Sequence, residues 1–187
     1  MSIETWDARR YTPAEARAIG ELIAQVWPKP NVTAEDRAQL LLALGRQFPD
    51  SASPFPRSFV VLDAGRVVAH AALLPRRIGT TSGPMVVGGL ARVGSDPALR
   101  GRGLGELVVR AALATVDAGE FPFALFQTNS RVRAFYEKFG AVRVENDVVN
   151  SLSADPTAPA FWDEIVMRYP GDRAWPTGEI DLLGPGY

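Results

Sequence analysis

The sequence MVVGGLARVGSDPALRGRGLG, at residues 85–105, joins a β-branched apolar run to a turn made of arginines and glycines. The apolar run predicts a strand. The stretch that follows, ELVVRAALATV, places its apolar side chains at helical spacing. This part of the chain is therefore predicted to run from a strand through a glycine-rich turn into a helix.

The glycine-rich turn, RGRGLG at residues 100–105, suits an anionic ligand. Its three glycines leave the backbone open where a helix presents its first unpaired N–H groups. Arg100 and Arg102 add positive charge, and the helix dipole favours negative charge at the same end. We predict a phosphate or pyrophosphate ligand, and a solvated basic turn is the alternative.

Two common phosphate-binding loops do not fit this turn. A Walker loop needs Gly-Lys followed by Ser or Thr, and a dinucleotide fingerprint spaces its glycines as G-x-G-x-x-G. The pattern here, Arg-x-x-Gly-x-Gly after a strand with Asp96 and Pro97 just upstream, resembles motif A of the GCN5-related N-acetyltransferases (GNAT). In that family the loop holds the pyrophosphate of coenzyme A.

A second segment, NSRVRAFYEKFGA at residues 129–141, is similar to motif B of the same family. The tyrosine of that motif points at the thioester sulfur, so the resemblance implies that Tyr136 donates a proton to the departing thiolate. A core tyrosine packed by Phe135 and Phe139 is the alternative. Asn129 is either a cofactor contact or a helix N-cap, and the sequence leaves both roles open.

The resemblance implies a set of contacts to acetyl-coenzyme A, and no metal is expected. The end of the motif A strand would pair with the pantetheine arm and polarise the thioester carbonyl through a main-chain N–H. The cofactor-binding residues implied in this way are Val93, Gly94, Ser95, Arg100, Gly101, Arg102, Gly103, Leu104, Gly105, Glu106 and Asn129.

The base that takes a proton from the amine is not identified by the sequence. Several family members place a glutamate about where Ala91 stands, and alanine cannot act as a base. His70 is the only histidine, and it lies in the apolar stretch VVAHAAL, where it could face the site or solvent. Glu145, Asp147 and deprotonation by solvent are further options.

Charge is divided unevenly along the chain. Residues 91–143 hold eight basic and five acidic side chains, whereas residues 144–187 hold two basic and eight acidic ones. The first part suits a phosphorylated cofactor and the second an ammonium-bearing acceptor, although solvated surface charge is the alternative. The stretch WPTGEIDLLGPGY, at residues 175–187, contains acidic residues and ends on an aromatic one. In outline it is similar to the end of the aminoglycoside 2′-N-acetyltransferases, which favours polyamine-like acceptors. The substrate-binding residues predicted from these features are His70, Asp147 and Asp181.

The rest of the chain predicts helices that begin at Thr12 and Thr33, and a tight hairpin at residues 63–65. The two helices and the loop at residues 48–57 are predicted to form an acceptor-side lid. Further strands are predicted at residues 123–128, 141–150 and 161–169. This order predicts an α/β (α+β) fold of GNAT type, with a central mixed, mostly antiparallel sheet flanked by helices.

The composition is that of an ordinary globular chain of 187 residues, 47% of them hydrophobic, with no cysteine and a net charge of −1. One acetyltransferase domain is predicted over residues 1–187, with motif A at about 86–118, motif B at about 123–144, and residues 145–187 on the substrate side. The absence of cysteine excludes disulfides and a thiol nucleophile. The cytoplasm is expected as the compartment, with no nucleic-acid or membrane partner.

The sequence therefore predicts an N-acetyltransferase that moves the acetyl group of acetyl-coenzyme A to a primary amine of a small molecule or peptide. Direct attack in a ternary complex is the expected route. The alternatives are a non-catalytic acyl-coenzyme A-binding module of the same fold, or an acyltransferase with a longer acyl donor. A homodimer is one arrangement that the sequence allows.

Overall fold

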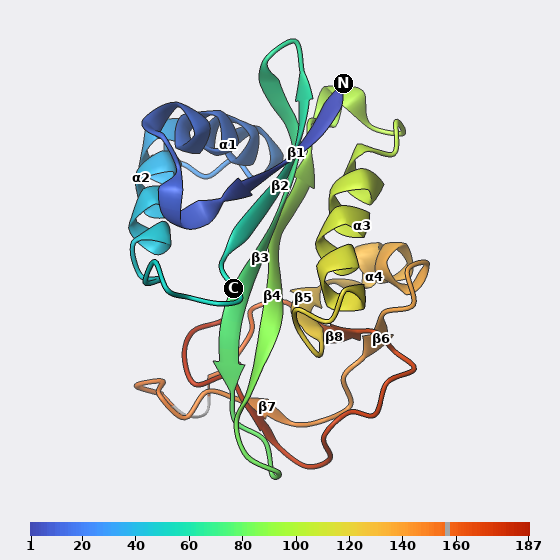
Figure 1. The fold of residues 1–187 in the computed structure, drawn as a ribbon. Coiled ribbons are helices and arrows are strands. Elements are labelled where there is room, and N and C mark those ends of the chain that lie inside the picture. Colours follow the sequence, from blue (N-terminus) through green and yellow to red (C-terminus); the bar gives the residue numbers. More distant parts are fainter. Residues whose placement is uncertain (156–157) are drawn as a thin grey trace. The chain divides into compact units, whose positions relative to one another are not determined.

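The computed structural model describes residues 1–155 and 158–187, and Figure 1 traces the chain through them. The helices are α1 (Pro13–Val26), α2 (Ala34–Gly45), α3 (Leu104–Asp117) and α4 (Ser130–Glu137), with the short 3-10 turns η1 (Ala8–Arg10) and η2 (Pro97–Leu99). The strands are β1 (Ser2–Asp7), β2 (Arg57–Asp63), β3 (Arg66–Ile78), β4 (Met85–Ser95), β5 (Ala124–Thr128), β6 (Val142–Arg143), β7 (Val148–Val149), β8 (Ile165–Tyr169) and β9 (Ile180–Asp181).

Seven of the strands in the described residues form one sheet, in the order β1-β2-β3-β4-β5-β8-β6. The pairs β1–β2, β2–β3, β5–β8 and β6–β8 are antiparallel, whereas β4 and β5 are parallel and are connected through α3. A mixed, mostly antiparallel sheet flanked by helices confirms the predicted fold class.

The chain divides into two compact units. The first contains residues 1–74 and 91–114, and the second contains residues 75–90 and 115–187. The strands β3 and β4 and the helix α3 each contribute residues to both units. The single acetyltransferase domain stays a prediction.

The hairpin predicted in the first unit is present. Ala64 and Gly65 have φ angles of 49° and 77°, and two consecutive positive φ angles are what a two-residue type I′ turn requires. β1 pairs with the other edge of β2. Sequence reasoning missed β1 because its first four residues are exposed and show no alternation of buried and exposed positions.

The helices α1 and α2 lie together on one side of the strands of the first unit, and α3 lies on the other (Figure 1). Each of the first two begins with a capping box, in which Thr12 and Glu15, or Thr33 and Asp36, exchange hydrogen bonds between side chain and backbone. Their apolar faces pack on β2 and β3 in a buried cluster of Ala16, Ile19, Leu22, Ile23, Ala38, Leu41, Val60 and Val67.

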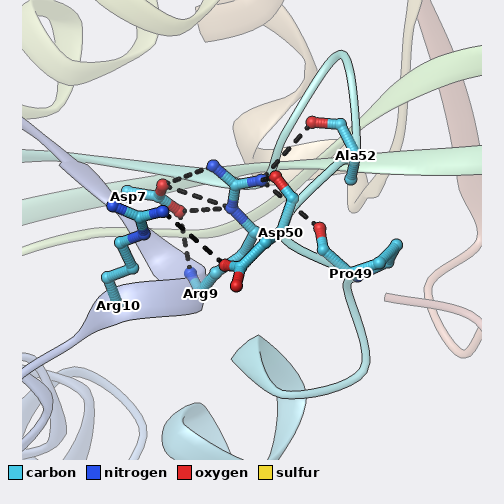
Figure 2. Close-up of polar contacts among 6 residues, drawn as sticks. All are labelled: Asp7, Arg9, Arg10, Pro49, Asp50 and Ala52. Atoms are coloured by element: carbon cyan, nitrogen blue, oxygen red, sulfur yellow. Dashed lines mark hydrogen bonds and ion pairs between the residues drawn. The ribbon is translucent and has the colours of Figure 1, made fainter.

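Figure 2 shows how the loop between α2 and β2 is attached to the start of the chain. The guanidinium of Arg9 pairs with Asp7 at 2.6 Å and donates to the main-chain oxygen of Asp50 at 2.6 Å. It also donates to the main-chain oxygens of Pro49 and Ala52 at 3.3 and 3.4 Å. This is the loop predicted as part of a lid, and any movement of it would have to break these bonds.

The strand predicted at residues 141–150 is wrong in extent. β6 pairs with β8 for only two residues, and β7 pairs with β9 in a separate two-stranded sheet. Asn146 lies between β6 and β7, and its amide nitrogen donates to the main-chain oxygens of Pro176 at 3.0 Å and Gly178 at 2.5 Å. These bonds fasten the segment to a distant loop, so it does not continue along β8.

Candidate functional site

The glycine-rich turn connects η2 to α3 in the first unit. Gly101 and Gly103 have φ angles of 79° and 73°, a conformation that glycine adopts without steric cost. A Cβ at either position would have no heavy atom within 4 Å. Arg100 and Arg102 are exposed, and α3 begins at Leu104. The turn thus combines open backbone, two guanidinium groups and a helix start, which is an arrangement suited to a phosphate.

Asp96 fixes the entry to this turn. Its carboxylate accepts from the N–H of Ala98 at 2.8 Å and pairs with Arg66 at 2.7 Å, while only 5% of its side chain is exposed. The Ala98 bond, and to a smaller extent Arg66, holds the pKa of Asp96 below its usual range. Beyond the turn, Glu106 pairs with Arg110 at 2.7 Å, so its carboxylate is turned along α3.

The strand end predicted to contact the thioester, Val93, Gly94 and Ser95, is half-buried in the first unit. A Cβ on Gly94 would lie 3.1 Å from the ring of Trp27 and 3.2 Å from a methyl group of Val26. The missing side chain therefore allows the end of α1 to approach β4 closely.

A buried chain of hydrogen bonds lies just before this strand end. The Tyr11 hydroxyl is hydrogen-bonded to Ser58 Oγ, Ser58 Oγ lies 2.7 Å from His70 Nε2, and His70 Nδ1 lies 2.9 Å from the main-chain oxygen of Arg92. A carbonyl can only accept, so Nδ1 carries the proton and Nε2 accepts from Ser58. Tyr11 then donates to Ser58, and the direction of every bond in the chain is fixed.

His70 is buried with both ring nitrogens engaged inside the protein. Burial is the main cause that lowers its pKa to about 4, so the ring is neutral at pH 7. Burial likewise raises the pKa of Tyr11 to about 12. Ser58 is also buried, which closes the Ser–His pair to a substrate. The predicted binding role of His70 stays a prediction, and its geometry is that of a residue that positions the backbone of Arg92.

Tyr136 and Asn129 lie at the two ends of α4 in the second unit. The Tyr136 ring is buried and packs on Phe126 and Phe135, with ring centroids 4.6 and 5.0 Å away. Burial raises the pKa of Tyr136 well above its ordinary value, and the charge of Asp163 adds to the shift. Asn129 accepts from the N–H of Arg131 at 3.1 Å, so it is the N-cap of α4.

The predicted acceptor carboxylates do not all gather at one place in the second unit. Asp147 lines a cavity of about 490 Å³ together with Glu145, Glu179 and Trp175. The carboxylate of Asp181 instead accepts from two backbone N–H groups, those of Ser151 and Leu183, each at 3.0 Å.

Tyr187 packs against other residues of the second unit. Its ring lies under the guanidinium of Arg76 at 4.8 Å, and its main-chain oxygen accepts from Gln127 at 3.0 Å. A Cβ on Gly89 would lie 2.6 Å from the ring, so this glycine makes room for the tyrosine. The pair of glycines at residues 88–89 was the available signal, because glycine in a strand often marks a close approach.

Two classes of feature are absent from the part of the chain that the structure describes. No helix there is long and apolar enough to cross a membrane. No group of three or more His, Cys, Asp or Glu side chains there is arranged to hold a metal ion.

The fold is shared with solved acyltransferase structures. The GNAT family N-acetyltransferase YhbS from Escherichia coli, in complex with CoA, aligns with a TM-score of 0.61 and 16% identity over 99% of this chain and 94% of its own. An acyl-CoA N-acyltransferase from Pseudomonas aeruginosa aligns with a TM-score of 0.58 and 21% identity over 89% of this chain and 97% of its own.

A GCN5-related N-acetyltransferase from Kribbella flavida aligns with a TM-score of 0.57 and 17% identity over 76% of this chain. The alignment covers 33% of that protein, so this chain spans about a third of its length. Identities this low establish the fold alone. No curated protein matches the chain in sequence.

Membership of a family follows from the sequence itself. The family model described as the acetyltransferase (GNAT) domain matches residues 7–143. The match covers most of the chain and includes the glycine-rich turn, Asn129 and Tyr136. The chain therefore belongs to the GNAT family of acetyltransferase domains.

Proposed function

We propose that this protein transfers the acetyl group of acetyl-coenzyme A to a primary amine of a small molecule or peptide, by direct attack in a ternary complex. Membership of the GNAT family supports an acyl-coenzyme A-dependent acyltransferase. The observation that carries the proposal is the open turn at Gly101 and Gly103, where two positive φ angles leave the backbone free of side chains beside a helix start. Arg100 and Arg102 supply the charge that a pyrophosphate needs.

The thioester arrives already activated, so most of the rate comes from holding a neutral amine against it. The amine nitrogen attacks the thioester carbonyl carbon, an amide bond forms, and the carbon–sulfur bond breaks. A main-chain N–H at Val93, Gly94 or Ser95 would polarise the carbonyl oxygen during the attack. The attacking nitrogen is positively charged in the tetrahedral intermediate, and it loses its proton to solvent as the amide forms.

The departing thiolate takes its proton from the Tyr136 hydroxyl in this mechanism, and the phenolate then regains a proton from solvent. A phenol keeps its proton at pH 7, and burial raises the pKa of Tyr136 further, so this hydroxyl can donate a proton and cannot act as a base. Its hydroxyl makes no hydrogen bond to another described residue. The O–H is therefore available to donate to a ligand.

No side chain is assigned as the base. Ala91 is a buried alanine on β4, and His70 has no ring nitrogen left to accept a proton from the amine. We propose that solvent deprotonates the acceptor, so that the fraction of free amine in solution sets the supply of nucleophile. The rate should then follow the pKa of the amine used.

We propose that the acidic residues after position 144 attract the ammonium form of the acceptor. Asp147 and Glu179 line the same cavity, so their two carboxylates can act on one cation. Asp181 would contribute only through its charge, because its hydrogen-bonding capacity serves the backbone. The cytoplasm stays the predicted compartment, and the homodimer stays a prediction.

Thiol release from acetyl-coenzyme A, followed over a panel of primary amines, tests the proposal directly. Calorimetry with coenzyme A run beside it separates the alternatives. Binding of coenzyme A with no thiol release for any amine would favour the non-catalytic module, which the alanine at position 91 also favours. Faster release from longer acyl-coenzyme A donors than from acetyl-coenzyme A would favour the other acyltransferase.

A further inference from the structure

Arg92 is partly buried, and its guanidinium has no hydrogen-bond or ion-pair partner among the described residues. It lies on β4 in the first unit, between Ala91 and the strand end assigned above to the thioester. Its Nη1 atom is buried and makes no hydrogen bond. No carboxylate among the described residues forms an ion pair with it. Arg9 and Arg66 in the same unit, by contrast, both pair with aspartates.

The backbone beneath this side chain is held in an uncommon conformation. Arg92 has a φ angle of 51°, which costs a residue with a Cβ roughly 1–2 kcal/mol. The hydrogen-bond chain from Tyr11 through Ser58 and His70 ends on the carbonyl of this same residue. Strained residues of this kind persist where the surrounding structure determines them, and they gather at functional sites. Here the buried chain fixes the direction in which the Arg92 side chain leaves the strand.

A partly desolvated cation without a counter-ion is unfavourable, because the protein supplies neither hydrogen bonds in place of the lost water nor a negative charge. Tyr11 is the ionisable group that acts on Arg92 electrostatically, and burial lowers the pKa of the guanidinium. A neutral phenol does not neutralise it. An oxyanion supplied from outside would neutralise the charge and would accept hydrogen bonds from the guanidinium.

We propose that Arg92 binds an oxyanion of the acceptor, so that the amine acetylated by this protein also carries a carboxylate or a phosphate. This assignment depends on the proposed function, since it names the class of acceptor for the same reaction. Both kinds of group offer oxygens that accept from a guanidinium. An amine with such a group would present its nucleophile while Arg92 holds its other end.

The test compares acceptors that differ only in this group. Amino acids are compared with their carboxamides, and 2-aminoethyl phosphate is compared with 2-aminoethanol, by kcat/KM for thiol release. Arg92→Met removes the charge at similar length, Arg92→Lys keeps the charge, and Arg17→Met is the control because Arg17 is exposed and pairs with Glu21 on α1. If the protein prefers the amino acid to its carboxamide, the natural group is a carboxylate. If it prefers 2-aminoethyl phosphate to 2-aminoethanol, the natural group is a phosphate.

The parent protein and Arg17→Met should prefer the oxyanion of at least one pair. Arg92→Met should lose roughly 10- to 150-fold in kcat/KM for that acceptor, which is the usual worth of a hydrogen bond to a charged group, mostly through KM. It should change little for the neutral partner, and Arg92→Lys should recover part of the loss. Equal preference in the parent and in Arg92→Met, or a parent that prefers the neutral acceptors, overturns the proposal.

A binding measurement keeps the proposal separate from the proposed function. With coenzyme A at saturation, acetate or phosphate should raise the melting temperature of the parent more than chloride does at equal ionic strength. The rise should be absent in Arg92→Met. If no amine is acetylated, the proposed function fails while this oxyanion effect still supports the site. If parent and variant respond alike, the Arg92 site is refuted whatever the enzyme does.

Discussion

Replacing Gly103 by glutamate is the sharpest test of the turn assigned to the pyrophosphate. Gly103 has a φ angle of 73°, and a Cβ there meets no heavy atom within 4 Å. The substitution therefore creates no clash and acts through two effects only. The first is the strain of placing a side chain at a positive φ, and the second is a negative charge beside the proposed anion site.

The two effects differ in size and in what they change. A positive φ costs a residue other than glycine about 1–2 kcal/mol, which for a chain of this length lowers the melting temperature by roughly 2–8 °C. Two unit charges about 6 Å apart repel each other by about 0.7 kcal/mol in water and by about 3 kcal/mol at an effective dielectric constant of about 20. A pyrophosphate presents two or more charges, so its affinity should fall at least about tenfold.

Gly65→Glu is the matched control, because Gly65 has a φ angle of 77° and also has no heavy atom within 4 Å of a Cβ. In a thermal scan without ligand, the melting temperatures of the two variants should fall below that of the parent by similar amounts. Only Gly103→Glu should lose coenzyme A affinity in calorimetry. Parental affinity in Gly103→Glu, or an equal loss in Gly65→Glu, would refute the assignment of the turn.

Three further outcomes are expected. Tyr136→Phe should bind acetyl-coenzyme A like the parent but turn over roughly 10²–10⁴-fold more slowly in single-turnover measurements, since it removes only the proton donor; an unchanged rate would make Tyr136 a packing residue. The pKa of His70 is about 4 in the folded protein and 6.5 when unfolded, so the unfolded chain takes up the proton first as the pH falls. Stability is therefore lost between pH 6.5 and 4, at about 1.4 kcal/mol per pH unit; urea titrations at pH 7 and 4.5 should show this loss in the parent, and it should be much smaller in His70→Gln. Asp181→Asn keeps an oxygen for the N–H groups of Ser151 and Leu183, so its melting temperature should stay near that of the parent while KM rises for a diamine more than for a monoamine. Equal KM changes for the two amines would count against a role of its charge in acceptor binding.

The local chemistry of the first unit could be predicted from the sequence because short-range signals decide it. Capping residues mark the starts of α1 and α2, and Ala64-Gly65 adopts the positive φ angles of a tight turn. The order of strand, turn and helix around Gly103 follows from the glycine spacing and from the change of apolar period from two to 3.6. None of these features needs a contact between distant parts of the chain.

The rest could not be predicted because it depends on long-range contacts. His70 could face the site or solvent by alternation alone, and only the fold brings Ser58 and the Arg92 carbonyl to its two nitrogens. The positive φ of Arg92 could not be predicted from the residue type, because arginine rarely adopts this conformation. The strand predicted through Asn146 failed for the same reason, because side-chain bonds to residues 176 and 178 decide where the chain turns.

The charge pattern and Arg92 favour different groups on the acceptor. An excess of acidic residues after position 144 favours an acceptor with an ammonium group, whereas an unpaired guanidinium favours an acceptor with an oxyanion. A polycation would satisfy the first condition and leave the partly buried guanidinium of Arg92 without a counter-ion. A simple anion would satisfy Arg92 but lacks the nucleophile that attacks the thioester. An amine that carries a carboxylate or phosphate supplies both the nucleophile and the oxyanion, and it is therefore the acceptor class in which screening should begin.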